Sequence, residues 1–486
     1  MVKKKVGRFI GRDQELKQLE SLQGKKAASL VVVKGRRRIG KSRLLDEFSL
    51  GKKRYKFMGL PPTQETTKDK EIEEFSRQLS VETDLPKVNV DDWSKLFSLL
   101  YTKVERGKVI IIFDEISWMG SQDESFLGKL KNAWDELFSK NPELILILCG
   151  SVSMWIDENI LNSRAFYGRI SWTIDLQPLP LNDCSRLLKQ QGFRGSYYEQ
   201  FKIFSVMGGI PWYLEQVQGK LSADENIQRQ CFTKGGILVE EFGRIFYEIF
   251  GKRDRIYKTL IEAIANGPAD YDTIAERSSY QSSGRLSEYL EDLTKAGFIA
   301  RDYTWSITSR KESRLSLYRL KDNYLRFFLK YIEPRLNQID KGRLSSLALS
   351  SLKGWESILG LQFENLILAN RKILLSRLHI REENIVADNP YFQRATKSQK
   401  GCQIDYLIQT NYLNLYAIEV KFCQGEVDSG IVEEMKEKIS RIKKPPKMVI
   451  LPVLIHVNGV KKSVKESGFF YEIIDFSDFL SEEIHG

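Results

Sequence analysis

An apolar strand that leads directly into a glycine-rich loop is the feature that most constrains this chain. Ser29-Leu-Val-Val-Val-Lys34 is followed at once by Gly35-Arg-Arg-Arg-Ile-Gly-Lys-Ser42. Between a strand and a helix, this pattern is typical of a phosphate-binding loop, because the glycines let successive backbone N–H groups point at phosphate oxygens. A glycine-rich turn that binds nothing is the alternative, and it explains the four fixed positions less well. The sequence therefore predicts a nucleoside triphosphate site, with ATP as its ligand.

Two side chains of this loop have predicted roles. Lys41 is expected to reach the β- and γ-phosphate oxygens, and the Ser42 hydroxyl to ligate Mg²⁺. The helix that begins near Lys41 would add the positive end of its dipole. The residues predicted to bind the nucleotide are Gly35, Arg36, Arg37, Arg38, Ile39, Gly40, Lys41, Ser42 and Arg43.

A second apolar strand ends in two carboxylates about seventy residues after the loop. Val109-Ile-Ile-Ile-Phe113 is followed by Asp114 and Glu115. Asp114 is predicted to hold Mg²⁺, and Glu115 to orient and deprotonate the attacking water, because phosphoryl transfer depends on positioning and charge neutralisation. A helix N-cap is the alternative explanation for an isolated Asp-Glu pair. Its pairing with the glycine-rich loop favours ATP hydrolysis.

Two further residues are candidates for the same site. Ser151 follows the apolar strand 144–148, and the carboxyl edge of a parallel sheet would bring its hydroxyl near the γ-phosphate as a sensor. Arg169 lies on the loop before the last core strand, where an arginine could reach a γ-phosphate in its own subunit or across a subunit interface. An ordinary turn serine and a solvated loop arginine are the alternatives.

Bulk composition excludes several classes of protein. The chain has 486 residues, 42% hydrophobic and 29% charged, which predicts two to four globular domains. No apolar run approaches the roughly 20 residues of a membrane-spanning helix, so we expect no membrane association. Five scattered cysteines indicate a reducing cytoplasm. With three histidines, bound metals would depend on carboxylates.

The net charge of +11 favours a polyanionic partner, and a surplus of solvated lysines is the alternative. Between Arg301 and Arg343 there are eleven Lys or Arg residues against five Asp or Glu. The aromatic residues Tyr324, Phe327, Phe328 and Tyr331 follow a helical period there, so we expect them in the core rather than stacked on bases. Only the positive charges of this segment therefore favour DNA as a partner.

The pattern of strands and helices predicts an α/β protein of five parts. The first is a parallel-sheet ATPase core with a phosphate-binding loop, and the last is a small α/β unit. Three short helices before a Gly-led hairpin predict a winged helix-turn-helix, although such units also serve as lids or protein-docking modules. The predicted boundaries are 1–180 for the ATPase core, 181–250 for a helical lid, 251–312 for the winged helix, 313–354 for a basic helical connector, and 355–486 for the α/β unit.

Over nearly its whole length the chain resembles the archaeal-type P-loop ATPases, which are related to AAA and signal-transduction (STAND) ATPases and carry a C-terminal domain once of unknown function. The resemblance rests on the loop at 35–42, Phe113-Asp-Glu115, Leu148-Cys-Gly-Ser151, Tyr167-Gly-Arg169 and Gly208-Gly-Ile-Pro211. The segment that begins Tyr318-Arg-Leu-Lys-Asp-Asn323 fits as well, and Phe9-Ile-Gly-Arg-Asp13 resembles the nucleotide-edge box of AAA-type and related signal-transduction ATPases. It implies ATPase activity at the matched positions, and the ATPase domain is a candidate for self-association into homo-oligomers.

A set of charged residues near the C-terminus suggests a second metal site. Asp405 lies on one predicted strand, Glu419 and Lys421 on the next, and Glu364 on a preceding helix. Glu419 and Lys421 share a face of their strand. A paired strand can bring Asp405 beside Glu419 to hold Mg²⁺, or Mn²⁺, while Lys421 polarises water or steadies the phosphate. The set resembles PD-(D/E)xK nucleases, with Ile404 in place of the named proline, which implies a restriction-endonuclease-like fold and DNA cleavage.

Two functions of different classes follow from these features. The first is an ATP- and Mg²⁺-dependent DNA-processing enzyme whose C-terminal domain cuts a phosphodiester. The second is a nucleotide-switched binding or regulatory protein whose C-terminal domain grips DNA or protein without cutting. For the second, Glu419 and Lys421 would be charged residues on the solvent face of a strand. A helicase-like motor is less favoured because no second motor domain is found.

Overall fold

The computed structural model describes residues 8–63, 65–151, 153–280, 284–344, 346–395 and 400–481. The chain divides into two compact units, Met1–Leu179 and Pro180–Gly486. Each unit contains one five-stranded sheet. Within the described residues, no helix is both long and apolar enough to cross a membrane.

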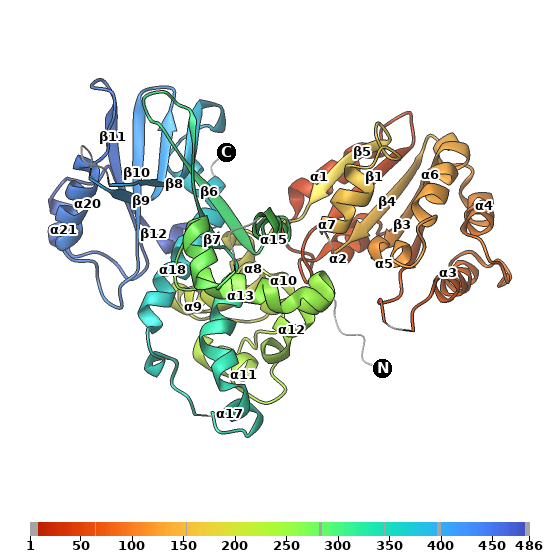
Figure 1. Ribbon diagram of the computed structural model, residues 1–486, viewed down its shortest axis with the longest axis horizontal. Coiled ribbons are helices and arrows are strands. Elements are labelled where there is room, and N and C mark those ends of the chain that lie inside the picture. Colours follow the sequence, from red (N-terminus) through yellow and green to blue (C-terminus); the bar gives the residue numbers. More distant parts are fainter. Residues whose placement is uncertain are drawn as a thin grey trace. The chain divides into compact units, whose positions relative to one another are not determined.

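The first unit is built on a parallel sheet (Figure 1). Its strands are β1 (Ser29–Lys34), β2 (Arg54–Met58), β3 (Val109–Asp114), β4 (Leu144–Gly150) and β5 (Ile170–Asp175). They lie in the order β2-β3-β4-β1-β5, and every pairing is parallel. β3 and β4 are buried along their whole length, as expected where helices cover both faces of a sheet. β4 therefore separates the loop-bearing strand β1 from the strand that ends in Asp114.

Helices follow the strands in the alternation that the sequence predicts. They are α1 (Asp13–Leu22), α2 (Lys41–Phe48), α3 (Lys68–Thr83), α4 (Trp93–Val104), α5 (Ile116–Gly120), α6 (Phe126–Glu136) and α7 (Ser153–Ile156). Part of the core beneath them is a cluster of aromatic rings, in which Phe75 stacks on Phe57 with centroids 4.4 Å apart. Trp93 packs edge-on to Phe126 in the same cluster. The predicted parallel-sheet ATPase core is confirmed as a fold.

The second unit begins with helices and a hairpin. The first helices are α8 (Leu181–Gln190), α9 (Tyr197–Met207), α10 (Pro211–Leu214), α11 (Ala223–Cys231) and α12 (Ile237–Phe250). Next come α13 (Asp254–Ile264), α14 (Tyr271–Arg277) and α15 (Gly284–Lys295). The antiparallel strands β6 (Ile299–Trp305) and β7 (Glu312–Leu320) follow. This is the three-helix and hairpin order that the sequence predicts, and its identity as a winged helix stays a prediction.

The segment 313–354 differs from the prediction that it is helical. Its first residues form β7, whose burial alternates with period two as in a half-buried strand. The predicted boundary at 312 thus falls at the start of a strand. Helical turns follow only from Asn323 onward: α16 (Asn323–Phe327), a π-helical turn (Phe328–Ile332) and α17 (Leu336–Asp340).

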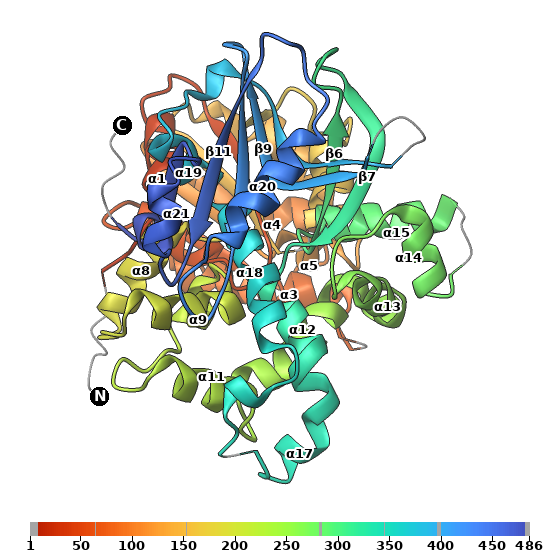
Figure 2. The same cartoon turned by 90° about the vertical axis from the view of Figure 1, so that its left-hand side faces the viewer.

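The C-terminal sheet is mixed. Its strands are β8 (Ile385–Gln393), β9 (Cys402–Thr410), β10 (Asn414–Lys421), β11 (Val449–His456) and β12 (Glu472–Asp475), in the order β12-β11-β10-β9-β8. β8, β9 and β10 pair antiparallel, whereas β10, β11 and β12 pair parallel. The accompanying helices are α18 (Trp355–Ala369), α19 (Arg371–Arg377), α20 (Gly430–Ser440) and α21 (Lys462–Glu466). α18 packs against β10. α20 packs against β9, in front of which it lies in Figure 2.

The hairpin and this sheet share a core. Trp305 and Ile307 belong to the apolar cluster that includes Leu415 of β10 and Met435 of α20. The Trp305 indole Nε1 donates a hydrogen bond to Gln409 Oε1 at 2.7 Å. The hairpin is therefore built into the C-terminal unit, although the sequence predicts a domain boundary between them. The finer division of 180–486 stays a prediction.

Candidate functional sites

The backbone of the glycine-rich loop takes conformations that favour glycine. Gly35 and Gly40 have φ angles of +146° and +94°, and Arg38 one of +69°. A Cβ atom at Gly35 would lie 2.7 Å from the carbonyl oxygen of Leu176. Gly40 is the residue before α2, so the loop ends at the N-terminus of that helix. The predicted strand, loop and helix are all present.

Lys41 arches back over the loop that it follows. Its side chain is buried, and Nζ donates to the carbonyl oxygens of Gly35 at 2.8 Å and Arg36 at 3.1 Å. The ammonium therefore lies inside the curve of the loop. A phosphate bound to the loop would meet this charge directly.

Asp114 and Ser42 meet at the carboxyl end of β3. Ser42 Oγ donates to Asp114 Oδ2 at 2.7 Å, and Asp114 is 1% exposed. The other oxygen, Oδ1, is buried and receives no hydrogen bond in the described part of the chain. A hydroxyl beside an unsatisfied carboxylate oxygen is a donor set that suits Mg²⁺ and its bound water. These residues fit the predicted magnesium site.

Glu115 and Ser151 are joined by hydrogen bonds. Glu115 has φ +53°, in the left-handed region, and its Oε2 accepts from the Ser151 backbone N–H at 3.0 Å and from Oγ at 2.9 Å. The strand order explains the contact, since β4 lies next to β3 and ends beside it. The structure thus brings the predicted base and the predicted sensor together.

Arg169 is engaged elsewhere in the first unit. Its guanidinium makes two hydrogen bonds to Asp135 of α6, at 2.7 and 2.8 Å. These bonds lower the pKa of Asp135 to about 2. The structure does not bring Arg169 to the glycine-rich loop, and its finger role stays a prediction.

Arg12 is a buried contact of the loop that the sequence analysis did not single out. One guanidinium nitrogen donates to the carbonyl oxygens of Ile39 at 3.1 Å and Gln177 at 2.7 Å, and another to Glu15. Arg12 therefore ties the N-terminal segment to the glycine-rich loop and to the chain after β5. The Gly11-Arg-Asp13 motif marked this segment, but only the fold shows what the guanidinium contacts.

The C-terminal carboxylates come from three elements. Glu364 lies on α18, Asp405 on β9 and Glu419 on β10. Burial, followed by the charge of Glu364, raises the pKa of Asp405 to about 7. Burial and the charge of Asp405 raise the pKa of Glu419 to about 7, and burial also raises the pKa of Glu364. The three predicted acids are thus close enough to influence one another.

A lysine of α20 neutralises this group. Lys438 Nζ donates to both carboxylate oxygens of Glu419, at 2.7 Å each. Asp405 Oδ2 accepts from the Val420 backbone N–H at 2.8 Å. Lys421, the predicted catalytic lysine, instead donates to Glu434 Oε2 at 2.9 Å. Nothing in the sequence marks Lys438, because its contact with Glu419 depends on how α20 packs on the sheet.

In this geometry the acids do not form a preformed metal cage. Among the residues that the structure describes, no group of three or more His, Cys, Asp or Glu side chains is arranged to hold a metal ion. A narrow cavity reaches Glu364 and Asp405 and is also lined by Asp302 and Arg319 of the hairpin. Arg319 is paired with Asp302 at 2.7 Å.

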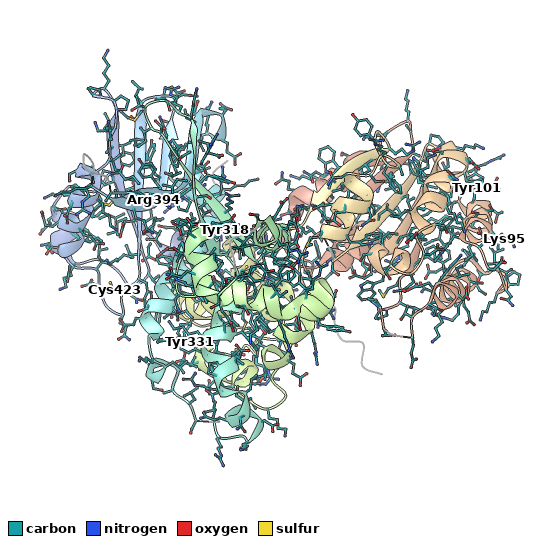
Figure 3. All side chains as sticks on the ribbon, viewed as in Figure 1. Lys95, Tyr101, Tyr318, Tyr331, Arg394 and Cys423 are labelled. Carbon is teal, nitrogen blue, oxygen red and sulfur yellow. The ribbon has the colours of Figure 1, made fainter. Side chains whose placement is uncertain are left out.

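At least one cation of the basic segment 301–343 is structural. Arg326 is 1% exposed and donates to Gln362 Oε1 and the Leu320 carbonyl, and burial lowers its pKa to about 9. The four aromatic rings that follow the helical period are buried, which confirms their predicted place in the core: Tyr324, Phe327, Phe328 and Tyr331, the last of them labelled in Figure 3. The cations that remain exposed on the hairpin are Arg301, Arg310, Lys311 and Arg314.

Comparisons with known proteins agree with the first site. Residues 9–217 match the model of an ATPase domain found predominantly in Archaea. An uncharacterized protein of Methanocaldococcus jannaschii is 27% identical over 335 residues, which cover 69% of this chain and 71% of that protein. Residues 9–217 are therefore similar to this ATPase domain.

Solved structures give weaker likenesses. A Walker-type ATPase of Pyrococcus abyssi is 21% identical, covers 66% of this chain and 96% of its own, and has a TM-score of 0.49. The ORC2 protein of Aeropyrum pernix, solved with ADPNP and ADP, is 14% identical, covers 69% of this chain and 95% of its own, and has a TM-score of 0.42.

Proposed function

We propose that this chain is an ATP- and Mg²⁺-dependent DNA-processing protein whose second unit holds a metal-dependent phosphodiesterase site. The observation that carries the second half is the convergence of Glu364, Asp405 and Glu419 from three elements: Glu364 and Asp405 are half-buried and line one cavity, and Glu419 is buried. The pKa of each acid is raised, first by burial and then by the charge of its neighbours. Buried acids are costly unless they are paired or bind a cation. A metal ion bound by these acids would offset the free-energy cost of burying them.

In the first unit, the loop backbone and Lys41 bind the phosphates, while Ser42 and Asp114 hold the magnesium ion. When bound, Mg²⁺ neutralises charge that develops on the phosphates. Glu115 orients the attacking water and accepts its proton. Ser151 now holds Glu115 Oε2, so it positions the base as well as being a candidate phosphate sensor.

In the second unit, Asp405 and Glu419 would supply oxygen ligands to Mg²⁺ or Mn²⁺, with Glu364 completing the set. Glu419 becomes available when Lys438 leaves its two oxygens. The freed ammonium then lies next to the metal site, where it can steady a phosphate. Lys438 therefore joins Lys421 as a candidate for the lysine role.

DNA is the proposed substrate because the exposed cations of the hairpin belong to the same unit as the acids. Arg301, Arg310, Lys311 and Arg314 could contact phosphates, and Arg319 of β7 lines the cavity that reaches Asp405. A DNA backbone that binds the hairpin would therefore extend toward the carboxylates.

The test is incubation of purified protein with supercoiled plasmid and Mg²⁺ or Mn²⁺. The wild type is expected to nick or cut the DNA, and Asp405→Asn and Glu419→Gln to lose at least 100-fold of that rate, since each removes a metal ligand. Glu472→Gln on β12, an exposed acid outside the group, is the matched control and should cut normally. Undiminished cleavage by Asp405→Asn would contradict the assignment.

One observation favours a second candidate, a nucleotide-switched DNA-binding or regulatory protein that does not cut. Lys438 forms an ion pair with Glu419 at 2.7 Å, and this pair can offset the cost of burying the carboxylate. In that case the acids stabilise the unit as an ion-pair network, and Lys438→Met should unfold it at lower temperature. Nucleotide-dependent DNA retention without any cleaved product, in wild type and in Lys438→Met, would support this candidate.

A further inference from the structure

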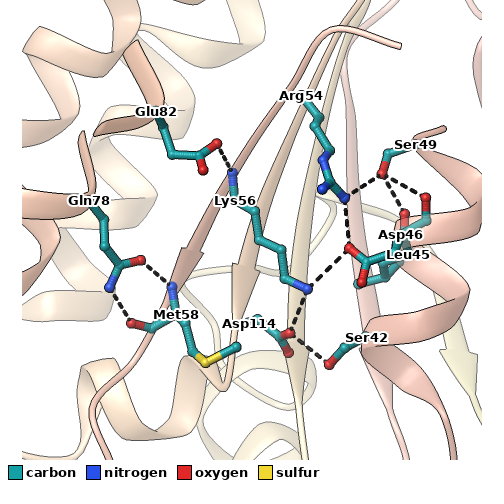
Figure 4. Close-up of polar contacts among 10 residues, drawn as sticks. All are labelled: Ser42, Leu45, Asp46, Ser49, Arg54, Lys56, Met58, Gln78, Glu82 and Asp114. Carbon is teal, nitrogen blue, oxygen red and sulfur yellow. Dashed lines mark hydrogen bonds and ion pairs between the residues drawn. The ribbon is translucent and has the colours of Figure 1, made fainter. Parts of the chain in front are cut away.

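Lys56 of β2 lies against the magnesium-binding carboxylate of the first unit (Figure 4). Its ammonium is 3.3 Å from Asp114 Oδ2 and 3.3 Å from Asp46 Oδ1. Asp114 belongs to β3, next to β2, and Asp46 to α2, the helix that follows the glycine-rich loop. One cation thus bridges an acid of the nucleotide site and an acid outside it.

The two acids differ in their surroundings. Asp114 is almost completely buried, whereas half of the Asp46 side chain is exposed. A buried carboxylate is expensive without a counter-charge, and Lys56 is the cation that the structure pairs with Asp114. The oxygen it contacts is also the one that accepts the Ser42 hydrogen bond. Lys56 and Mg²⁺ would therefore compete for the same carboxylate.

The backbone of Lys56 is fixed from the other side by α3. Gln78 of that helix donates to the Met58 carbonyl at 2.9 Å and accepts from the Met58 N–H at 2.8 Å. Glu82 accepts from the Lys56 N–H at 3.3 Å. These side chains form hydrogen bonds to the backbone at the outer edge of β2, in the place where another strand would pair (Figure 4). Only the flexible end of Lys56 is free to change partner.

We propose that Lys56 is a tethered cation that competes with Mg²⁺ for Asp114 and so sets the magnesium concentration at which nucleotide binds. Without magnesium it neutralises Asp114. When magnesium nucleotide binds, the ammonium turns to Asp46, which already lies within reach. The inference rests on the magnesium–nucleotide site of the proposed function.

The test measures the Mg²⁺ concentration that gives half-maximal binding of N-methylanthraniloyl-ADP to the full chain. Lys56→Met should lower this midpoint about 5-fold, because it removes a competing charge a few ångströms from the carboxylate. Lys56→Arg should leave it near the wild-type value. Arg54→Met is the matched control, since in the described part of the chain Arg54 pairs with the same Asp46 oxygen at 2.7 Å and with Ser49, not with Asp114.

Asp46→Asn gives a test of opposite sign on an exposed residue, where misfolding is not expected. It removes the second partner of Lys56, so the ammonium stays on Asp114 and the Mg²⁺ midpoint should rise about 3-fold. In the Lys56→Met background, Asp46→Asn should have no effect.

The outcomes separate the two proposals. An unchanged or raised midpoint in Lys56→Met, or an equal effect of Asp46→Asn in both backgrounds, would overturn the competition while leaving the nucleotide site intact. Failure of the wild type to bind the nucleotide at any Mg²⁺ concentration would contradict the nucleotide site itself, and the inference with it.

Discussion

Lys56 and Lys438 have parallel contacts in the two units. Each ammonium lies against a buried carboxylate that is proposed to bind a metal ion, Asp114 in the first unit and Glu419 in the second. A lysine can release such an acid without leaving the site, because its four-carbon side chain is flexible. One lysine in each unit can thus offset the charge of the buried carboxylate, and it can move aside when a metal ion binds there.

Substitutions at Lys41 and Glu115 should separate nucleotide binding from hydrolysis. Lys41→Ala removes the charge inside the loop and is expected to weaken ATP binding at least 100-fold. Glu115→Gln should bind ATP normally and lose turnover, because the base is gone while the phosphate contacts remain. Equilibrium binding and steady-state hydrolysis measure both. Equal ATP affinity in wild type and Lys41→Ala would contradict the assignment.

The acids of the second unit should make stability depend on pH. The pKa values of Asp405 and Glu419 are raised from ordinary carboxyl values to about 7, so folding favours their protonated forms. Their contribution is fully present below the unfolded pKa and is lost as pH rises through about 7. The thermal midpoint of the second unit should fall over that window in metal-free buffer.

Asp405→Asn is the variant that checks this effect. An amide does not titrate, so its thermal midpoint should fall less than that of the wild type between about pH 5 and pH 8. Glu472→Gln, an exposed acid, should follow the wild type. Identical pH profiles for Asp405→Asn and wild type would show that Asp405 is ionised throughout.

At the scale of elements, the sequence predicts those whose pattern is unambiguous. β3 and β4 are continuous apolar runs, and both were placed within a residue or two. β7 falls in the segment that is predicted as a basic helical connector, whereas its buried and exposed residues alternate as in a strand. The sequence does not mark β8, because the polar residues Asp388 and Asn389 and the proline Pro390 interrupt its apolar residues.

The same limit applies to the sites. Residues within one motif, such as Lys41 and Ser42, follow from the sequence because a local backbone positions them. The sequence does not predict the contacts of Arg12, Lys56 and Lys438, since each of these side chains reaches its partner from another element. Only the packing of the elements brings these cations to their acids.

The hairpin formed by β6 and β7 is the element expected to bind DNA. Replacing Arg310, Lys311 and Arg314 with Gln should weaken DNA binding and reduce the slope of log K against log salt by about 2 to 3, because each lost phosphate contact releases one counterion fewer. Replacing Lys461, Lys462 and Lys465, near α21, removes the same charge elsewhere and should change the slope little. Equal slopes in both triple variants would show that the hairpin is not the DNA-binding element.

At the scale of the whole molecule, Arg169 raises the question of self-association. It is bound to Asp135 rather than to the loop of its own subunit, which is compatible with a role at a neighbouring subunit. We predict that mixing Arg169→Ala with Lys41→Ala restores ATPase activity, because a mixed dimer contains one complete site. About a quarter of wild-type activity is expected from random dimers. A mixture as inactive as its parts would rule out this role.

The most direct test of the central claim, a second metal site built by the C-terminal acids, is to count bound Mn²⁺ by electron paramagnetic resonance in nucleotide-free protein carrying Lys41→Ala. We predict one bound ion per chain, held more tightly as pH rises through about 7 and lost in Glu419→Gln. No bound Mn²⁺, or equal binding by Glu419→Gln, would contradict the account.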